Sequence, residues 1–219
     1  MRDSILASKT EWRKLLRDND YLFSAFLAFV FLGVCLVVNY FAGVYATVSA
    51  TSAVGDLVLD HLPEFNVSII FIYGSFFMWV LTAIILLGHP KMVPYVIKSI
   101  GLFLLVRSSF VILTHIGPFP HVVPADPYSL MAYFTFGGDL FFSGHTGTPF
   151  LLGLLFWDNR WLRTFYIISS GVFGAAVLMG HLHYSIDVYA AFFITYGIYK
   201  ISRILFAKDY SRFALEKVV

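Results

Sequence analysis

The stretch "YLFSAFLAFVFLGVCLVVNYFAGVYATV", residues 21–48, contains no Lys, Arg, Asp or Glu. An α-helix needs about 20 mostly apolar residues to cross a hydrocarbon layer about 30 Å thick, and this stretch exceeds that length. Of the 219 residues, 59% are hydrophobic and 13% are charged, compared with about 25% charged in soluble domains. The mean hydropathy is +0.79. The sequence therefore predicts an integral membrane protein in contact with the lipid bilayer, with no nucleic-acid partner.

Further apolar runs follow the first, and together they predict an all-α bundle of six transmembrane helices. The predicted spans are residues 21–48, 67–88, 95–115, 144–157, 161–180 and 186–206, of which the fourth is visibly short. We expect a cytoplasmic or interfacial segment at 1–20, a six-span membrane domain with the functional residues at 21–206, and a cytoplasmic tail at 207–219.

The N-terminal segment argues against a cleaved signal peptide, and the cysteine content limits disulfides and metal sites. Residues 1–20 mix basic with acidic side chains and are too long and too acidic for the first part of a signal peptide, so we expect the first span to be retained. Cys35 is the one cysteine of the chain, which excludes an intramolecular disulfide and a cysteine metal cluster.

The positions of the basic residues indicate how the chain is oriented in the membrane. Of the 15 Lys and Arg, five precede the first span, two flank the turn between spans two and three, two flank the turn between spans four and five, and five close the chain. The connections near residues 49–66, 116–143 and 181–185 contain none. By the positive-inside rule, both termini are cytoplasmic and these connections face the outside or a lumen.

Arg107 is the basic residue that topology leaves unexplained, because it lies well inside the third predicted span. An arginine there is costly unless it meets water, a carboxylate or an anionic ligand. An anion site is the preferred interpretation, and a structural ion pair is the alternative. The histidines are also uneven: His89 falls on the inner side, whereas the other six fall near the outer ends of spans. These six are His61, His115, His121, His145, His181 and His183.

Two of the outer polar clusters have the spacing of a reactive site. His183 and Asp187 are four residues apart at the start of the sixth span, so they share one helix face and the carboxylate can hold one imidazole nitrogen. The other nitrogen would then be basic and nucleophilic. As an alternative, "HLH" and "HxxxD" are spacings that also suit a zinc site.

The second cluster is "GGDLFFSGHTG", residues 137–147, which precedes the fourth span. Either Ser143 or Thr148, the latter followed by Pro149, can cap this helix. Both choices leave His145 near a helix N-terminus, which favours phosphate, and glycines such as Gly144 allow close approach of a ligand.

A depth estimate brings these residues together. Arg107, His145 and Asp187 each lie 13 residues from a cytoplasmic marker, or roughly 20 Å above the inner boundary. We therefore expect a recessed, outward-opening phosphate site formed by three helices.

With these residues in view, the chain resembles the sphingomyelin synthase branch of the type 2 phosphatidic acid phosphatase superfamily. The resemblance rests on "GGDLFFSGHTG", on "HYSIDVYAAFFITY" and more loosely on "VRSSFVILTHIGPFP", and it covers about residues 95–200. "DLVLDHLPEF", residues 56–65, is faintly similar to the family's first outer segment.

The resemblance implies His145, His183 and Asp187 as the catalytic residues. His183, made basic by Asp187, would attack a lipid phosphate, and His145 would protonate the departing oxygen. A phosphohistidine intermediate would pass phosphocholine or phosphoethanolamine from a phospholipid donor to a ceramide-like or other lipid alcohol, without metal or cofactor. The substrate-binding residues that we expect are Arg107, Asp139, Ser143, Gly144 and Tyr184.

The sequence also departs from the family. Gly137 stands where the synthases carry cysteine, Val177 stands where the wider superfamily has an arginine, and the superfamily pattern "KxxxxxxRP" is absent. Fewer phosphate-binding cations make a simple phosphomonoesterase less expected. Two alternatives stay open: a phosphatase or phospholipase C that uses water as the acceptor, and a non-enzymatic lipid-binding membrane protein.

Overall fold

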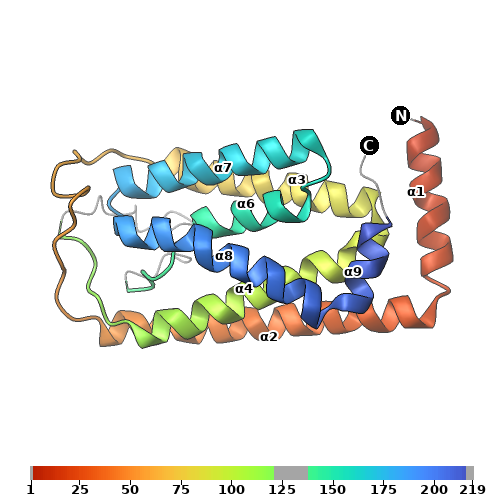
Figure 1. Ribbon diagram of the computed structural model, residues 1–219, viewed down its shortest axis with the longest axis horizontal. Coiled ribbons are helices and arrows are strands. Elements are labelled where there is room, and N and C mark those ends of the chain that lie inside the picture. The colour runs from red at the N-terminus through yellow and green to blue at the C-terminus, as the bar shows by residue number, and fades with distance from the viewer. Residues whose placement is uncertain (1, 121–137, 216–219) are drawn as a thin grey trace.

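The computed structural model describes residues 2–120 and 138–215, and within these ranges it contains helices and no strand. The long helices lie side by side along one axis (Figure 1). The α-helices are α1 (Arg2–Leu15), α2 (Asn19–Ser49), α3 (Ser75–Gly88), α4 (Val93–Leu113), α6 (Gly144–Leu155), α7 (Arg160–Met179), α8 (Ser185–Leu205) and α9 (Ala207–Ala214). A π-helical turn, η1 (Ile70–Gly74), runs directly into α3, and a 3₁₀ turn, η2 (Pro90–Met92), runs into α4.

Side-chain caps set several of the helix starts. Asp18 accepts hydrogen bonds from the first turn of α2, and Asn159 accepts one from Leu162 in α7. Ser143 caps α6, where its Oγ accepts from the Thr146 N–H at 3.4 Å. The alternative cap at Thr148 is wrong, because Thr148 and Pro149 both lie inside α6 and the helix has already begun at Gly144.

The count of six membrane spans is not confirmed. Among the described residues, four helices are long and apolar enough to cross a membrane: Asn19–Ser49, Ile70–Gly88, Pro90–Leu113 and Arg160–Met179. A fifth is reached if α8 is counted together with α9, which bends away from it by 97°. The physical reason is length, because the 12 residues of α6 extend only about 18 Å.

The short helix α6 lies at the centre of the bundle and is packed against α4, α7 and α8. Most of its side chains are buried, among them Leu151, Leu152 and Leu155. A helix that is apolar on all sides is stabilised by burial from all sides. By contrast, α2 packs along α4 and exposes phenylalanine and valine side chains on its outer face, as suits contact with lipid.

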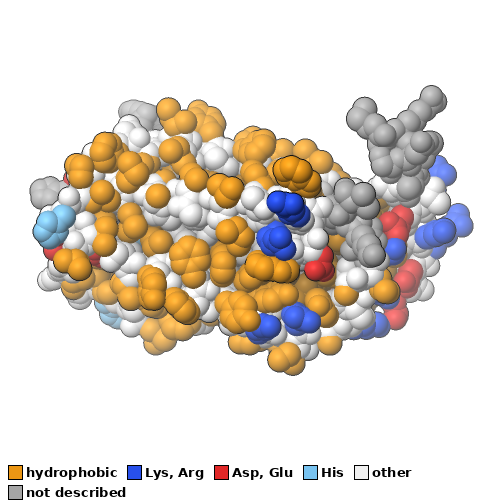
Figure 2. Space-filling view, turned by 45° about the horizontal axis from the view of Figure 1, so that its top comes forward, with side chains coloured by type: hydrophobic (Ala, Val, Ile, Leu, Met, Phe, Trp, Pro, Cys, Tyr) orange, Lys and Arg blue, Asp and Glu red, His pale blue; other side chains and the backbone are white. Residues whose placement is uncertain are grey.

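The two ends of the bundle differ. We call the end with α1 and α9 the terminal end, and the end with the α7–α8 turn (residues 180–184) the distal end (Figure 1). In Figure 2, hydrophobic side chains extend along the visible face, Lys and Arg gather toward the terminal end, and His side chains appear at the other end. This distribution agrees with an integral membrane protein.

At the terminal end, the two peripheral helices are tied to the bundle. In α1, Trp12 Nε1 donates to the Leu87 carbonyl at 2.8 Å. In α9, Asp209 accepts from Lys98 at 2.6 Å and from Ser24 at 2.5 Å. The predicted tail thus begins with a docked helix. The division of the chain at residues 20 and 206 stays a prediction.

Candidate active site

A cavity of about 250 Å³ lies inside the bundle, between α2, α3, α4, α6 and the distal turn. Its lining includes five of the residues that the sequence singled out. These are Arg107, Asp139, Gly144, His145 and His183. Residues that are far apart in the chain therefore converge, as the depth estimate predicts.

His183 and Asp187 form the predicted pair. The His183 Nδ1 lies 3.2 Å from Asp187 Oδ2, and the two side chains are 7% and 0% exposed. His183 lies just before α8 rather than inside it, since Tyr184 is the N-cap residue. Asp187 is in the first turn, where the helix dipole favours a carboxylate. Its Oδ2 also accepts the Tyr184 N–H at 3.0 Å. Both contacts hold the Asp187 carboxylate next to the His183 imidazole.

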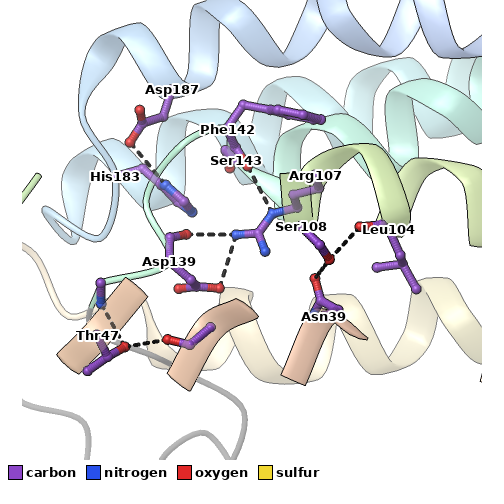
Figure 3. A network of polar contacts seen from close by, with 12 residues as sticks. Asn39, Thr47, Leu104, Arg107, Ser108, Asp139, Phe142, Ser143, His183 and Asp187 are labelled. Carbon is purple, nitrogen blue, oxygen red and sulfur yellow. Dashed lines mark hydrogen bonds and ion pairs between the residues drawn. The ribbon is translucent and has the colours of Figure 1, made fainter. Parts of the chain in front are cut away.

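Figure 3 shows the His183 ring extending from Asp187 toward Arg107 and Asp139. When Nδ1 donates to the carboxylate, Nε2 carries the lone pair. That nitrogen is then available on the side of the cavity.

His145 lies in the first turn of α6 and lines the same cavity as His183. The Phe71 ring is against it, with ring centroids 3.8 Å apart, and Phe173 approaches edge-on at 6.4 Å. Neither ring nitrogen of His145 has a hydrogen-bond partner among the residues that the structure describes. The first N–H groups of a helix also lack intrahelical partners, and here the first two residues of α6, Gly144 and His145, line the cavity.

Arg107 uses two of its three nitrogens to hold the loop before α6. Nε donates to the Phe142 carbonyl at 2.9 Å, and Nη2 donates to the Asp139 carbonyl at 2.8 Å. Nη2 also forms an ion pair with the Asp139 carboxylate at 3.0 Å. Both interpretations of Arg107 therefore have support: the ion pair exists, and Nη1 has no hydrogen bond to any described residue while Arg107 itself lines the cavity (Figure 3).

Gly144 favours this arrangement, because a larger residue would crowd Arg107. A Cβ atom there would lie 3.1 Å from Arg107 Nε and 3.5 Å from its Cδ. The arginine is itself anchored by the loop, so it has little room to move away. The glycine therefore permits the guanidinium to lie against the start of α6.

An outer segment, residues 51–66, lies over the distal turn and holds it in place. Asp56 Oδ2 accepts the Ser185 N–H at 2.7 Å, the Leu62 carbonyl is 2.9 Å from His181 Nε2, and the Phe65 N–H donates to Met179. Burial raises the pKa of Asp56, but hydrogen bonds from Ser185, Leu59 and Val58 outweigh it and lower the pKa below its ordinary value. An ionised Asp56 thus caps the helix that carries Asp187.

Two of the predicted substrate-binding residues do not line the cavity. The Tyr184 hydroxyl donates to the Gly117 carbonyl at 2.8 Å and accepts from the Val54 N–H at 3.2 Å, so it joins the outer connections. Ser143 is fully buried, caps α6, and donates its N–H to the Asp187 carbonyl. Both residues connect parts of the site without facing its interior.

The remaining histidines are less central. His181 lines the cavity but contacts the Phe119 ring and the Leu62 carbonyl, and His121 lies outside the described residues. Within residues 2–120 and 138–215, no three His, Cys, Asp or Glu side chains come close enough together to hold a metal ion, as the zinc interpretation requires.

The sequence interpretation missed several residues of the cavity, among them Phe71, Asn39 and Ser75. Phe71 gave no signal, because it is one aromatic residue in an apolar run. Asn39 and Ser75 also line the cavity, and an amide within a membrane span is a signal that could have found Asn39.

Comparison with known proteins gives one match, to a family model described as PAP2 superfamily C-terminal, over residues 137–204. No curated protein matches the chain, and no solved structure matches it. The matched residues supply α6, α7 and nearly all of α8, with both histidines and Asp187. This match supports the type 2 phosphatidic acid phosphatase superfamily, whose members are lipid phosphatases or phosphotransferases, and does not single out the sphingomyelin synthase branch.

Proposed function

We propose that the protein is a membrane lipid phosphotransferase that moves a phospholipid head-group phosphate to a lipid alcohol. The observation that supports this best is the buried contact of 3.2 Å between His183 Nδ1 and Asp187 Oδ2, in a cavity shared with His145 and Arg107. An imidazole held in this way has its second nitrogen free as a nucleophile.

In the first step, His183 Nε2 attacks the phosphorus of the donor lipid. A nitrogen–phosphorus bond forms and the bond from phosphorus to the diacylglycerol oxygen breaks. His145, in its protonated form, gives its proton to that oxygen and is left neutral. Arg107 Nη1 and the first N–H groups of α6 stabilise the charge on the phosphoryl oxygens.

In the second step, neutral His145 removes the proton of an acceptor hydroxyl, and the oxygen attacks the phosphorylated His183. The nitrogen–phosphorus bond breaks, the product phospholipid leaves, and both histidines return to their starting states. A ceramide-like or other lipid alcohol can reach the site from the bilayer. In this scheme, His183 forms and then loses the bond to phosphorus, and His145 transfers the proton in both steps.

The charge of the site supports a phosphodiester donor, such as a phosphocholine or phosphoethanolamine lipid. Arg107 is the one Lys or Arg side chain among the described residues that line the cavity, and the Asp139 carboxylate already neutralises part of its charge at 3.0 Å. A phosphodiester carries a single negative charge, whereas a phosphomonoester carries nearly two. The site therefore suits the monoanion better.

For orientation, we propose that the distal end faces the outside or a lumen and that both termini are cytoplasmic. The basic residues of the sequence support this assignment through the positive-inside rule. The active site would then act on lipids of the leaflet opposite the cytoplasm.

The test is turnover of a phospholipid labelled in its head group, in mixed micelles with ceramide. We expect diacylglycerol together with a stoichiometric labelled ceramide product, and loss of both in His183→Ala. A matched control is His61→Ala, because His61 is exposed in the outer segment and outside the cavity lining. Full activity of the His183→Ala variant would refute the proposal.

The second candidate is a lipid phosphatase or phospholipase C of the same chemistry, which the description of the matched family favours. Water would then be the acceptor in the second step. Diacylglycerol release that is independent of ceramide, with free phosphocholine or inorganic phosphate as the other product, would identify this reaction.

A further inference from the structure

Two polar side chains of the cavity have no role in the phosphate chemistry described above. Asn39 lies in α2, and Ser75 lies at the start of α3, directly after the π-helical turn η1. The two helices lie on different sides of the bundle (Figure 1). Both side chains adjoin the same cavity as the histidines, so a ligand in that cavity can meet them together with its phosphate.

Asn39 has an uncommitted donor group. Its Oδ1 accepts from Ser108 Oγ at 3.4 Å, and Ser108 directly follows Arg107 in α4 (Figure 3). Its amide nitrogen forms no hydrogen bond to any residue that the structure describes. Asn39 is the one amide side chain of the run 21–48. An unpaired amide in a membrane span is costly, so the Asn39 amide nitrogen is a candidate donor to a ligand in the cavity that Asn39 lines.

Ser75 gives an independent indication of the same kind. Its Oγ is shielded from solvent and has no hydrogen-bond partner within the described part of the chain. Serine in a helix usually donates to the carbonyl four residues earlier, as Ser99 and Ser108 do here. Ser75 does not make this hydrogen bond, and the residue lines the cavity.

The position of Asn39 fits the part of a lipid just below its phosphate. Thr47, on the same helix, accepts the Gly138 N–H near the distal end. Asn39 is two turns further in, about 12 Å deeper. The deeper lining is apolar, with Met78, Phe103 and Leu104. Beside the phosphate-binding Arg107, the cavity thus offers two neutral polar side chains and an apolar wall.

We propose that Asn39 and Ser75 form a second polar subsite, which binds the carbonyl oxygen of the ester or amide linkage in the lipid backbone. This inference rests on the proposed function and specifies its substrate class: lipids whose chains are joined through a carbonyl. The Asn39 amide nitrogen and the Ser75 hydroxyl donate hydrogen bonds, and a linkage carbonyl accepts them. An ether-linked lipid has no carbonyl there and leaves both donors unpaired.

The experiment compares a diester phosphatidylcholine with its diether analogue of the same chain length. For the unaltered protein we expect kcat/KM to be about tenfold higher with the diester, the effect of losing one hydrogen bond in a buried site. Asn39→Leu, of similar size, brings the ratio of the two values close to one. Ser75→Ala lowers the ratio by about threefold.

The matched control is Ser109→Ala, which removes a hydroxyl from an exposed position of α4 that bonds only to its own helix and does not line the cavity. We expect Ser109→Ala to keep the tenfold ratio of kcat/KM between the diester and the diether lipid. Equal turnover of the two lipids by the unaltered protein, or an undiminished ratio in Asn39→Leu, would overturn the subsite.

Binding of the same two lipids to His183→Ala separates this inference from the proposed function. Trp79 lines the cavity and provides a fluorescence signal for binding. Absence of turnover by the unaltered protein, together with a tenfold preference of His183→Ala for binding the diester, refutes the transferase and keeps the subsite. Turnover of both lipids without any preference refutes the subsite alone.

Discussion

At the residue scale, the proposed mechanism has Asp187 determine which nitrogen of His183 reacts. Asp187→Asn keeps a side-chain oxygen for the Tyr184 N–H, which Asp187 Oδ2 accepts at 3.0 Å, but removes the charge that holds the imidazole proton on Nδ1. We expect kcat to fall by about 100- to 10,000-fold with a small change in KM. Steady-state kinetics in micelles measures the two constants.

Thermal unfolding distinguishes a loss of chemistry in Asp187→Asn from a loss of folding. The midpoint of thermal unfolding of Asp187→Asn should stay within a few degrees of the unaltered protein. An unchanged kcat in a variant that is folded would mean that the carboxylate has a structural role only.

How far sequence predicts individual residues depends on the distance between partners. His183 and Asp187 are one helical turn apart, so their contact follows from spacing even though α8 begins after His183. The partner of Arg107 could not be derived in this way, because Asp139 is 32 residues away and precedes a different helix. Phe71 contacts His145 through tertiary packing, which no local pattern encodes.

At the element scale, the outer segment stabilises the start of α8 through Asp56. The pKa of Asp56 is lowered in the folded state, so its ionised form stabilises the fold above the unfolded value of about 3.9. This contribution disappears as the pH falls through the lower, folded-state pKa. We expect Asp56→Asn to be less stable than the unaltered protein at pH 6, and the difference to shrink below about pH 4.

The measurement is thermal unfolding in detergent over a series of pH values. Glu64→Gln is the matched control, because Glu64 is an exposed carboxylate of the same segment. A difference between Asp56→Asn and the unaltered protein that is constant from pH 6 to pH 3 would contradict the assignment.

The docking of α9 provides a second test at this scale. Lys98 and Asp209 form an ion pair of 2.6 Å with side chains 13% and 6% exposed. Asp209→Leu leaves the lysine without its counter-charge and should destabilise the protein by about 3 kcal/mol. Adding Lys98→Met should restore most of the loss, which thermal unfolding of the single and double variants can check. No recovery in the double variant would show that the pair does not hold α9.

Element positions were predictable where apolar runs were long, and less so elsewhere. Five of the predicted spans correspond within a few residues to α2, to η1 together with α3, and to α4, α7 and α8, because a continuous apolar run is a strong signal. The fourth run became the short helix α6, whose environment is other helices rather than lipid. Hydropathy does not distinguish these two surroundings. The outer segment has no helical or strand periodicity, so its docking could not be predicted.

At the scale of the whole molecule, the distribution of charge predicts the orientation. Cys35 is buried and is the one cysteine of the chain, so a Cys35→Ala background is free of thiols. In intact cells, Glu64→Cys in this background should react with a membrane-impermeant maleimide, whereas Lys208→Cys should react only after permeabilisation. The reverse pattern of labelling would place the distal end in the cytoplasm.

The central claim is that His183 carries the phosphoryl group between donor and acceptor, and trapping the intermediate tests it most directly. The protein is incubated with phospholipid labelled in the head group, without acceptor, quenched in alkali, digested and analysed by mass spectrometry. We predict an acid-labile label on the peptide that contains His183, which is absent from His183→Ala. Product formation with no label on His183, or with the label on another side chain, would contradict the account.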